Sequence, residues 1–256
     1  MLSTPAATDV ARHLVFPDAF GYADLASLVR RAHRADPDAA VRLQATGTTL
    51  VTWVGVLAGS GLLADGAVVG VRAAELATPA ALDLVVSAAA LTDRFARDEH
   101  ATTPTAAGPE LLASGPLRLA VPAATVFAPW AGALPGAGGW VPVGSLSSAR
   151  VAETARAGIE EIMSGSAEGA GSLAVQALRQ RVWSRPVPFD AAADPSAGVG
   201  PPRDAPAGST VRSLPAGAAF ASYVLGFVQP DGPALPVYRS GRWLRLHTPA
   251  GHVLAR

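Results

Sequence analysis

The sequence predicts an α+β fold in which helices pack against an antiparallel sheet. Three observations lead to this prediction: an apolar stripe at helical spacing over residues 18–35, two β-type runs joined by a short turn over residues 41–54, and a β-meander over residues 236–256. Ala is abundant and buries little area, so the core must come mainly from Leu, Val, Phe and Trp.

The first predicted helix covers residues 18–35. Its apolar side chains recur at helical spacing and share one face: Leu25, Leu28, Val29 and Ala32. The pair Asp36-Pro37 ends it, because the residue before a proline is pushed out of the helical region. A shorter helix over residues 8–14 is expected to precede it.

A β-rich region follows and completes a first module over residues 1–101. Its runs of Val, Leu and Thr are separated by Gly-containing turns, as strands usually are. The predicted elements are a hairpin of strands 41–45 and 50–54 around a turn at 46–48, strands at 67–71 and 82–87, and a helix at 88–97.

Residues 102–147 are interrupted by Pro and Gly and are expected to form a packed connection with one strand at 117–121. Trp130 and Trp140 lie in this connection. Because Trp is large and apolar, a loop that carries two of them is expected to pack down onto the rest of the molecule.

Residues 148–256 begin with two helices and end in the meander. The predicted elements are helices at 148–163 and 172–183, a flexible linker at about 189–215, a buried helix at 216–228, and strands at 236–239, 242–247 and 252–256. The second helix is expected to bury Leu173, Ala177, Leu178 and Val182. The alternative to these three segments is one continuous domain.

Composition excludes several kinds of chemistry and partner. The 256 residues carry 20 acidic and 20 basic side chains, all of the basic ones Arg, so the net charge is zero. A neutral chain lacks the basic excess of phosphate-backbone binders, so no nucleic acid is expected as a partner, whereas neutrality favours self-association or a protein partner. The absence of Cys excludes disulfides and thiol chemistry. We see no signal peptide and no apolar run of about 18 residues, and therefore expect no membrane association and a cytoplasmic location.

The C-terminal meander holds the one candidate site. Alternation along the middle strand places Trp243, Arg245 and His247 on one face. Depending on the strand register, His252 and Arg256, or Tyr238 and Arg239, join that face. A ring beside Arg and His side chains can bind an anion or an aromatic ligand. The alternative is an ordinary sheet face on which Trp243 covers the core and the Arg heads are solvated.

Other chemistry has little support in the sequence. The His residues lack the i, i+4 spacing of a helical zinc pair, and no carboxylate lies near His247 and His252 in the sequence, so no metal site is predicted. No Ser occupies a G-x-S-x-G elbow, and a Walker-type loop is impossible without Lys, so we predict no catalytic residue and no cofactor. Glu160 and Glu161 point in different directions on a helix and are expected to be solvated.

Two parts of the chain carry short motifs: the end, from Arg-Ser-Gly-Arg-Trp at 239–243 through Gly-His-Val-Leu-Ala-Arg at 251–256, and residues 178–185 with their Arg-x-Arg-Val-Trp run. In these motifs the chain resembles uncharacterised hypothetical proteins of high-GC actinobacteria. The resemblance implies an intracellular bacterial protein and brings no activity and no catalytic residue with it.

Three classes of function remain open. The favoured class is a non-catalytic interaction or regulatory protein, because no catalytic or cofactor signature is present. The alternatives are a small-ligand or anion-binding protein or enzyme that uses the Trp243/Arg245/His247 face, and a structural subunit of a homo-oligomer. A concave cluster of these side chains would favour a ligand site, and a flat apolar patch would favour a protein interface.

Overall fold

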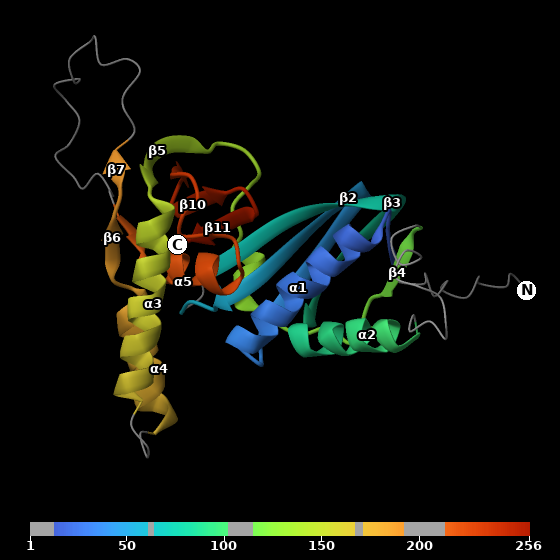
Figure 1. Ribbon diagram of the computed structural model, residues 1–256, viewed down its shortest axis with the longest axis horizontal. Helices are drawn as coiled ribbons and strands as arrows, with labels where there is room; N and C mark the ends of the chain where they lie inside the picture. Colours follow the sequence, from blue (N-terminus) through green and yellow to red (C-terminus); the bar gives the residue numbers. More distant parts are fainter. Residues whose placement is uncertain (1–12, 61–63, 102–114, 167–170, 192–212) are drawn as a thin grey trace, which may run out of the picture. The chain divides into compact units, whose positions relative to one another are not determined.

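The computed structural model describes residues 13–60, 64–101, 115–166, 171–191 and 213–256. Over these residues the fold is α+β, as predicted (Figure 1). The chain divides into two compact units, one of Met1–Thr52 with Ala73–Phe127 and one of Trp53–Arg72 with Ala128–Arg256. None of the described helices is long and apolar enough to cross a membrane.

In the first unit, helix α1 (Ala19–Ala35) packs against helix α2 (Ala88–Ala101) and against the strand pair of β1 (His13–Phe16) and β4 (Leu117–Ala120). The predicted helix at 18–35 is confirmed, because the Asp18 side chain accepts a hydrogen bond from the Gly21 amide at 2.9 Å and caps the first turn. The predicted helix at 8–14 falls mostly outside the described residues, and its last two residues begin β1.

Two long strands replace the predicted hairpin. Strand β2 (Ala40–Leu57) runs without a reversal through residues 46–48, and β3 (Val68–Ser87) joins the two strands predicted at 67–71 and 82–87. Burial in β2 alternates on odd residues up to Ala45 and on even residues from Leu50, with Gly47 at φ +59° between them. Such a shift of one residue is what a β-bulge produces, and composition alone does not distinguish a bulge from a turn.

The second unit contains the meander. Strands β9 (Leu235–Ser240), β10 (Trp243–Thr248) and β11 (Gly251–Ala255) pair antiparallel, and β11 continues onto β3. On the other side, β9 pairs with β5 (Val141–Leu146) and β5 with β7 (Asp190–Ala191), in the order β2-β3-β11-β10-β9-β5-β7. The C-terminal meander is thus confirmed, whereas β5 was missed because Pro142 and Gly144 obscure its alternation.

Three helices complete this unit: α3 (Ser148–Gly165), α4 (Ser172–Trp183) and α5 (Ala216–Val224). Helix α3 packs against both α4 and α5. Helix α5 is buried, as predicted, although it ends four residues early. The predicted stripe of α4 is wrong in part, since Leu173 and Ala177 are exposed and Val182 is buried. The short helix η2 (Pro129–Gly132) brings Trp130 into the core, where an added Cβ on Gly55 would overlap its indole.

The linker predicted at 189–215 lies largely outside the described residues, which omit 192–212. Its described ends are ordered: β7 pairs with β5, and β8 (Ser213–Pro215) pairs with β6 (Pro186–Pro188). Phe189 is buried against Gly144, so the prediction of an unstructured segment fails at both ends of the range.

Candidate functional site

The meander gathers aromatic, Arg and His side chains on one face. In the antiparallel register Arg245 lies opposite Tyr238 on β9, and His247 lies opposite His252 on β11. Directly opposed residues point to the same face of a sheet. The five residues singled out from the sequence therefore come together on one face: Trp243, Arg245, His247, His252 and Arg256. The other face of β10 is buried and fixes the strand.

Arg245 is held by two aromatic rings. Its guanidinium carbon lies 4.6 Å from the ring centroid of Trp140 and 4.6 Å from that of Tyr238. Both distances are within the range of cation–π attraction, which restrains the guanidinium without supplying any hydrogen-bond acceptor. Its Nε–H is buried and has no hydrogen-bond partner, and no carboxylate in the described part of the chain pairs with it. Arg245 is half-buried and its Nε–H is sealed from solvent, so an external acceptor would have to approach the terminal nitrogens of the guanidinium.

His247 and His252 form a pair beside this cation. Their Nδ1 atoms are 3.1 Å apart and their ring centroids 4.8 Å apart. The His247 ring also meets Tyr238 edge-on, with centroids 6.4 Å apart. Burial, together with the nearby charges of His247 and Arg245, lowers the pKa of His252 from 6.5 to about 4, so this imidazole is neutral at pH 7.

Trp243 and Arg256 take a more structural place on the same face. Trp243 is 5% exposed, so its ring belongs to the core and offers no open platform. The Arg256 guanidinium carbon lies 5.9 Å from its centroid, and the Arg256 Nε lies 3.3 Å from the Asp65 Oδ1. Arg256 therefore already has an acidic partner, unlike Arg245.

Sequence reasoning placed Trp140 in a packed loop and did not connect it with the site. The pairing of β5 with β9 puts Val141 opposite Arg239 and Pro142 opposite Tyr238, which brings the preceding Trp140 to Arg245. No local pattern signals this contact, since the two residues are far apart in the sequence. We call the group formed by Trp140, Tyr238, Arg245, His247 and His252 the Arg245 face.

Two family models match the chain, and each describes a domain of unknown function. Residues 10–114 match DUF8010, and residues 135–256 match DUF8185. The Arg245 face lies entirely within the region that matches DUF8185. No curated protein matches this chain.

Among solved structures, the chain has a distant likeness to bacterial sliding clamps. The similar chains include "Caulobacter crescentus pol III beta", at 12% identity and a TM-score of 0.42, and a DNA polymerase sliding clamp from Pseudomonas aeruginosa, also at 12% and 0.42. A Caulobacter crescentus beta sliding clamp is 13% identical with a TM-score of 0.43. Each match covers 95% of this chain and 64% of the other, so the chain spans less than two thirds of those proteins.

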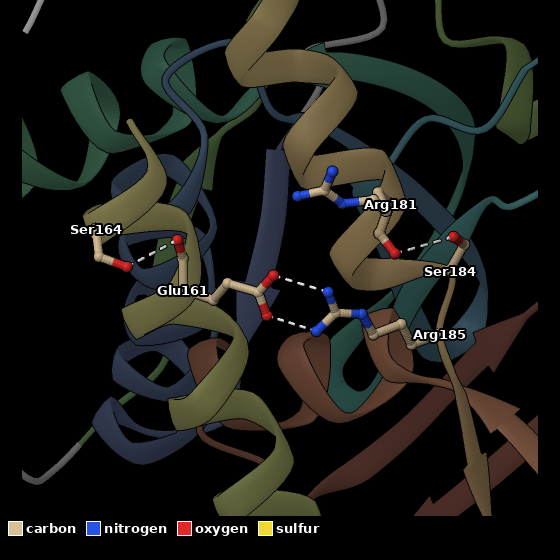
Figure 2. Close-up of polar contacts among 5 residues, drawn as sticks. All are labelled: Glu161, Ser164, Arg181, Ser184 and Arg185. Carbon is tan, nitrogen blue, oxygen red and sulfur yellow. Dashed lines mark hydrogen bonds and ion pairs between the residues drawn. The ribbon is translucent and has the colours of Figure 1, made fainter. Parts of the chain in front are cut away.

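The DUF8185 region also holds an open groove of about 510 Å³ between α3 and the β6 segment. At its edge the Arg185 guanidinium donates two hydrogen bonds to the Glu161 carboxylate, at 2.5 and 2.7 Å (Figure 2). Arg185 lowers the pKa of Glu161, with a smaller contribution from the charge of Arg181. The Glu161 side chain is exposed, as expected, and it pairs with Arg185 at the surface because the turn after α4 brings Arg185 back to α3.

The DUF8185 region thus presents two polar arrangements with different capacities. The Glu161–Arg185 pair is mutually satisfied and exposed, so it has little charge to offer a ligand. Arg245 is unpaired in the described structure and restrained by rings, which suits it to accept an anion. The described residues contain no group of three or more His or acidic side chains placed to hold a metal ion.

Proposed function

We propose that this protein is a non-catalytic binding protein whose Arg245 face recognises a carboxylate of a small ligand or a protein partner. The observation that carries the proposal is the unpaired Arg245 guanidinium held by Trp140 and Tyr238 at 4.6 Å each. Two N–H groups of an Arg guanidinium match the two oxygens of a carboxylate. A guanidinium that is already restrained loses less entropy on binding than a mobile one.

The surrounding charge supports the choice of an anion. Asp231 is the one acidic residue after Asp204 in the sequence, so residues 232–256 supply no Asp or Glu side chain that would compete for Arg245. The rings beside the guanidinium favour an apolar or aromatic group next to the bound carboxylate.

The absence of catalysis is part of the proposal. His252 is the most perturbed titratable group of the face, and its Nδ1 is engaged with His247. A pKa near 4 makes this imidazole a poor base at neutral pH, because a general base works best with a pKa near the working pH.

Binding of benzoate tests the proposal, with benzamide as the neutral isostere. We expect benzoate, and not benzamide, to shift the indole N–H signal of Trp140 in NMR spectra, a signal assigned with Trp140→Phe. Arg245→Gln should weaken benzoate binding roughly ten- to a hundredfold, since a charge-assisted hydrogen bond contributes about 1.5–3 kcal/mol.

Arg239→Gln is the matched control. Arg239 lies on β9, is exposed, and pairs with Leu244, so it belongs to the opposite face. Equal shifts from benzoate and benzamide, or unchanged benzoate affinity in Arg245→Gln, would overturn the proposal. If Arg245→Gln does not fold, Arg245→Lys keeps the charge and removes the fork, and should still weaken binding.

A further inference from the structure

A cross-strand histidine pair lies at the end of the meander. His247 on β10 and His252 on β11 are directly opposed in the antiparallel register. The tight turn that joins the strands is closed by the Thr248 hydroxyl, which donates to the Gly251 carbonyl at 2.8 Å. Leu246 and Val253, the neighbours on the two strands, are fully buried. The backbone beneath the two imidazoles is therefore held by a closed turn on one side and a buried face on the other.

The spacing of the two rings suits shared coordination of one metal ion. Zinc–imidazole bonds are about 2.0–2.1 Å long, so two nitrogens on one metal lie about 3.0–3.4 Å apart. The two Nδ1 atoms are 3.1 Å apart. A linear N–H···N hydrogen bond of this length would place the ring centroids about 5.4 Å apart, whereas convergence on one metal places them about 4.8 Å apart. The observed centroid separation is 4.8 Å.

From this geometry we infer that His247 and His252 bind one divalent transition-metal ion of the class that prefers imidazole, such as Zn²⁺ or Cu²⁺, through their Nδ1 atoms. Nothing in the two matching domain families assigns such a site. Two protein ligands leave the remaining coordination positions to water or to an external ligand.

The charges around the pair bear on its affinity for a cation. The charged group that faces the pair is Arg245, whose positive charge opposes a dication and so limits the affinity. Tyr238 contacts His247 edge-on through its ring.

Isothermal titration of the 256-residue chain, without a tag, with ZnCl₂ in a non-coordinating buffer tests the inference. We expect one saturable site per chain with a Kd below about 0.1 mM. His247→Gln should weaken it at least about tenfold, since even the loss of a hydrogen-bond partner to a ligand commonly costs that much. His247 is exposed, so this variant keeps the core intact.

The matched control is His33→Gln, which removes a histidine from α1 in the other unit and should leave the affinity unchanged. Cu²⁺ provides a second readout, because its electron paramagnetic resonance spectrum should show two nitrogen ligands in the parent chain and fewer in His247→Gln. Absence of a saturable Zn²⁺ site, or equal affinities in the parent chain and His247→Gln, would mean that the rings share only a hydrogen bond and would overturn the inference.

Discussion

Gly158 on α3 faces the indole of Trp183, and the substitution Gly158→Ala probes how firmly that ring is held. A Cβ added at Gly158 would lie 2.5 Å from the Trp183 Cη2 and closer still to its Cζ3. Trp183 cannot withdraw easily, because it is 3% exposed and stacks on Phe220 with centroids 4.4 Å apart. The backbone of α3, or the ring pair, must therefore shift.

Two opposing effects set the magnitude. Ala is a better helix former than Gly by about 1 kcal/mol, which favours the variant. Overpacking of a well-filled core costs about 1–3 kcal/mol. The 2.5 Å approach to a buried ring places Gly158→Ala near the upper end of that cost, so we expect a net loss of about 1–2 kcal/mol. For a unit of this size that corresponds to a fall in Tm of about 3–8 °C.

Urea unfolding followed by far-UV circular dichroism measures this loss, and a double-mutant cycle assigns it. In a Trp183→Leu background the clash is removed, so Gly158→Ala should become neutral or stabilising. Ala157→Gly, at the exposed neighbouring position, is the control for helix propensity and should cost about 1 kcal/mol. A stabilising effect of Gly158→Ala in the parent chain would refute the reasoning, because it would show that Trp183 moves at little cost.

Two further predictions concern His252 on β11 and Asp18 at the start of α1. In metal-free protein the pKa of His252 is about 4 when folded and about 6.5 when unfolded, so the unfolded state binds more protons between these values. The free energy of unfolding should therefore fall by about 1–2 kcal/mol as the pH drops from about 6.5 to about 4, after allowance for the partial exposure of the ring. In urea titrations at several pH values, His252→Gln should flatten this dependence. Asp18→Ala should lower the free energy of unfolding by about 1 kcal/mol in the same assay, because the Gly21 amide loses its hydrogen-bond acceptor. Asp18→Asn keeps a side-chain oxygen at this position and should retain most of that stability. Equal losses of stability in the two variants would contradict the capping role.

Local patterns identified the elements whose signals lie within a few residues. The stripe of α1 and its Asp18 cap, the two helices α3 and α4, and the turns of the meander each depend on residues that are near neighbours in the chain. Such patterns fail where one local signal fits two structures. The Thr46-Gly47-Thr48 segment suits either a hairpin turn or a bulge, and only the pairing of β2 with β3 along the sheet decides between them.

The candidate site shows the same division. Alternation and the short turn between His247 and His252 were enough to place Trp243, Arg245 and His247 on one face. The sequence could not reveal that Trp140 packs on Arg245, that Arg256 is paired with Asp65, or that Glu161 meets Arg185. Each of these contacts joins segments that are distant in the chain, so their formation depends on strand register and helix packing. The sequence shows that a residue is Arg, and it does not show whether its side chain is paired, solvated or held by aromatic rings. The neutral, Cys-free composition limited the chemistry open to this chain. Among the described residues, the tertiary structure decided that Arg256 pairs with Asp65 and that Arg245 is held by aromatic rings.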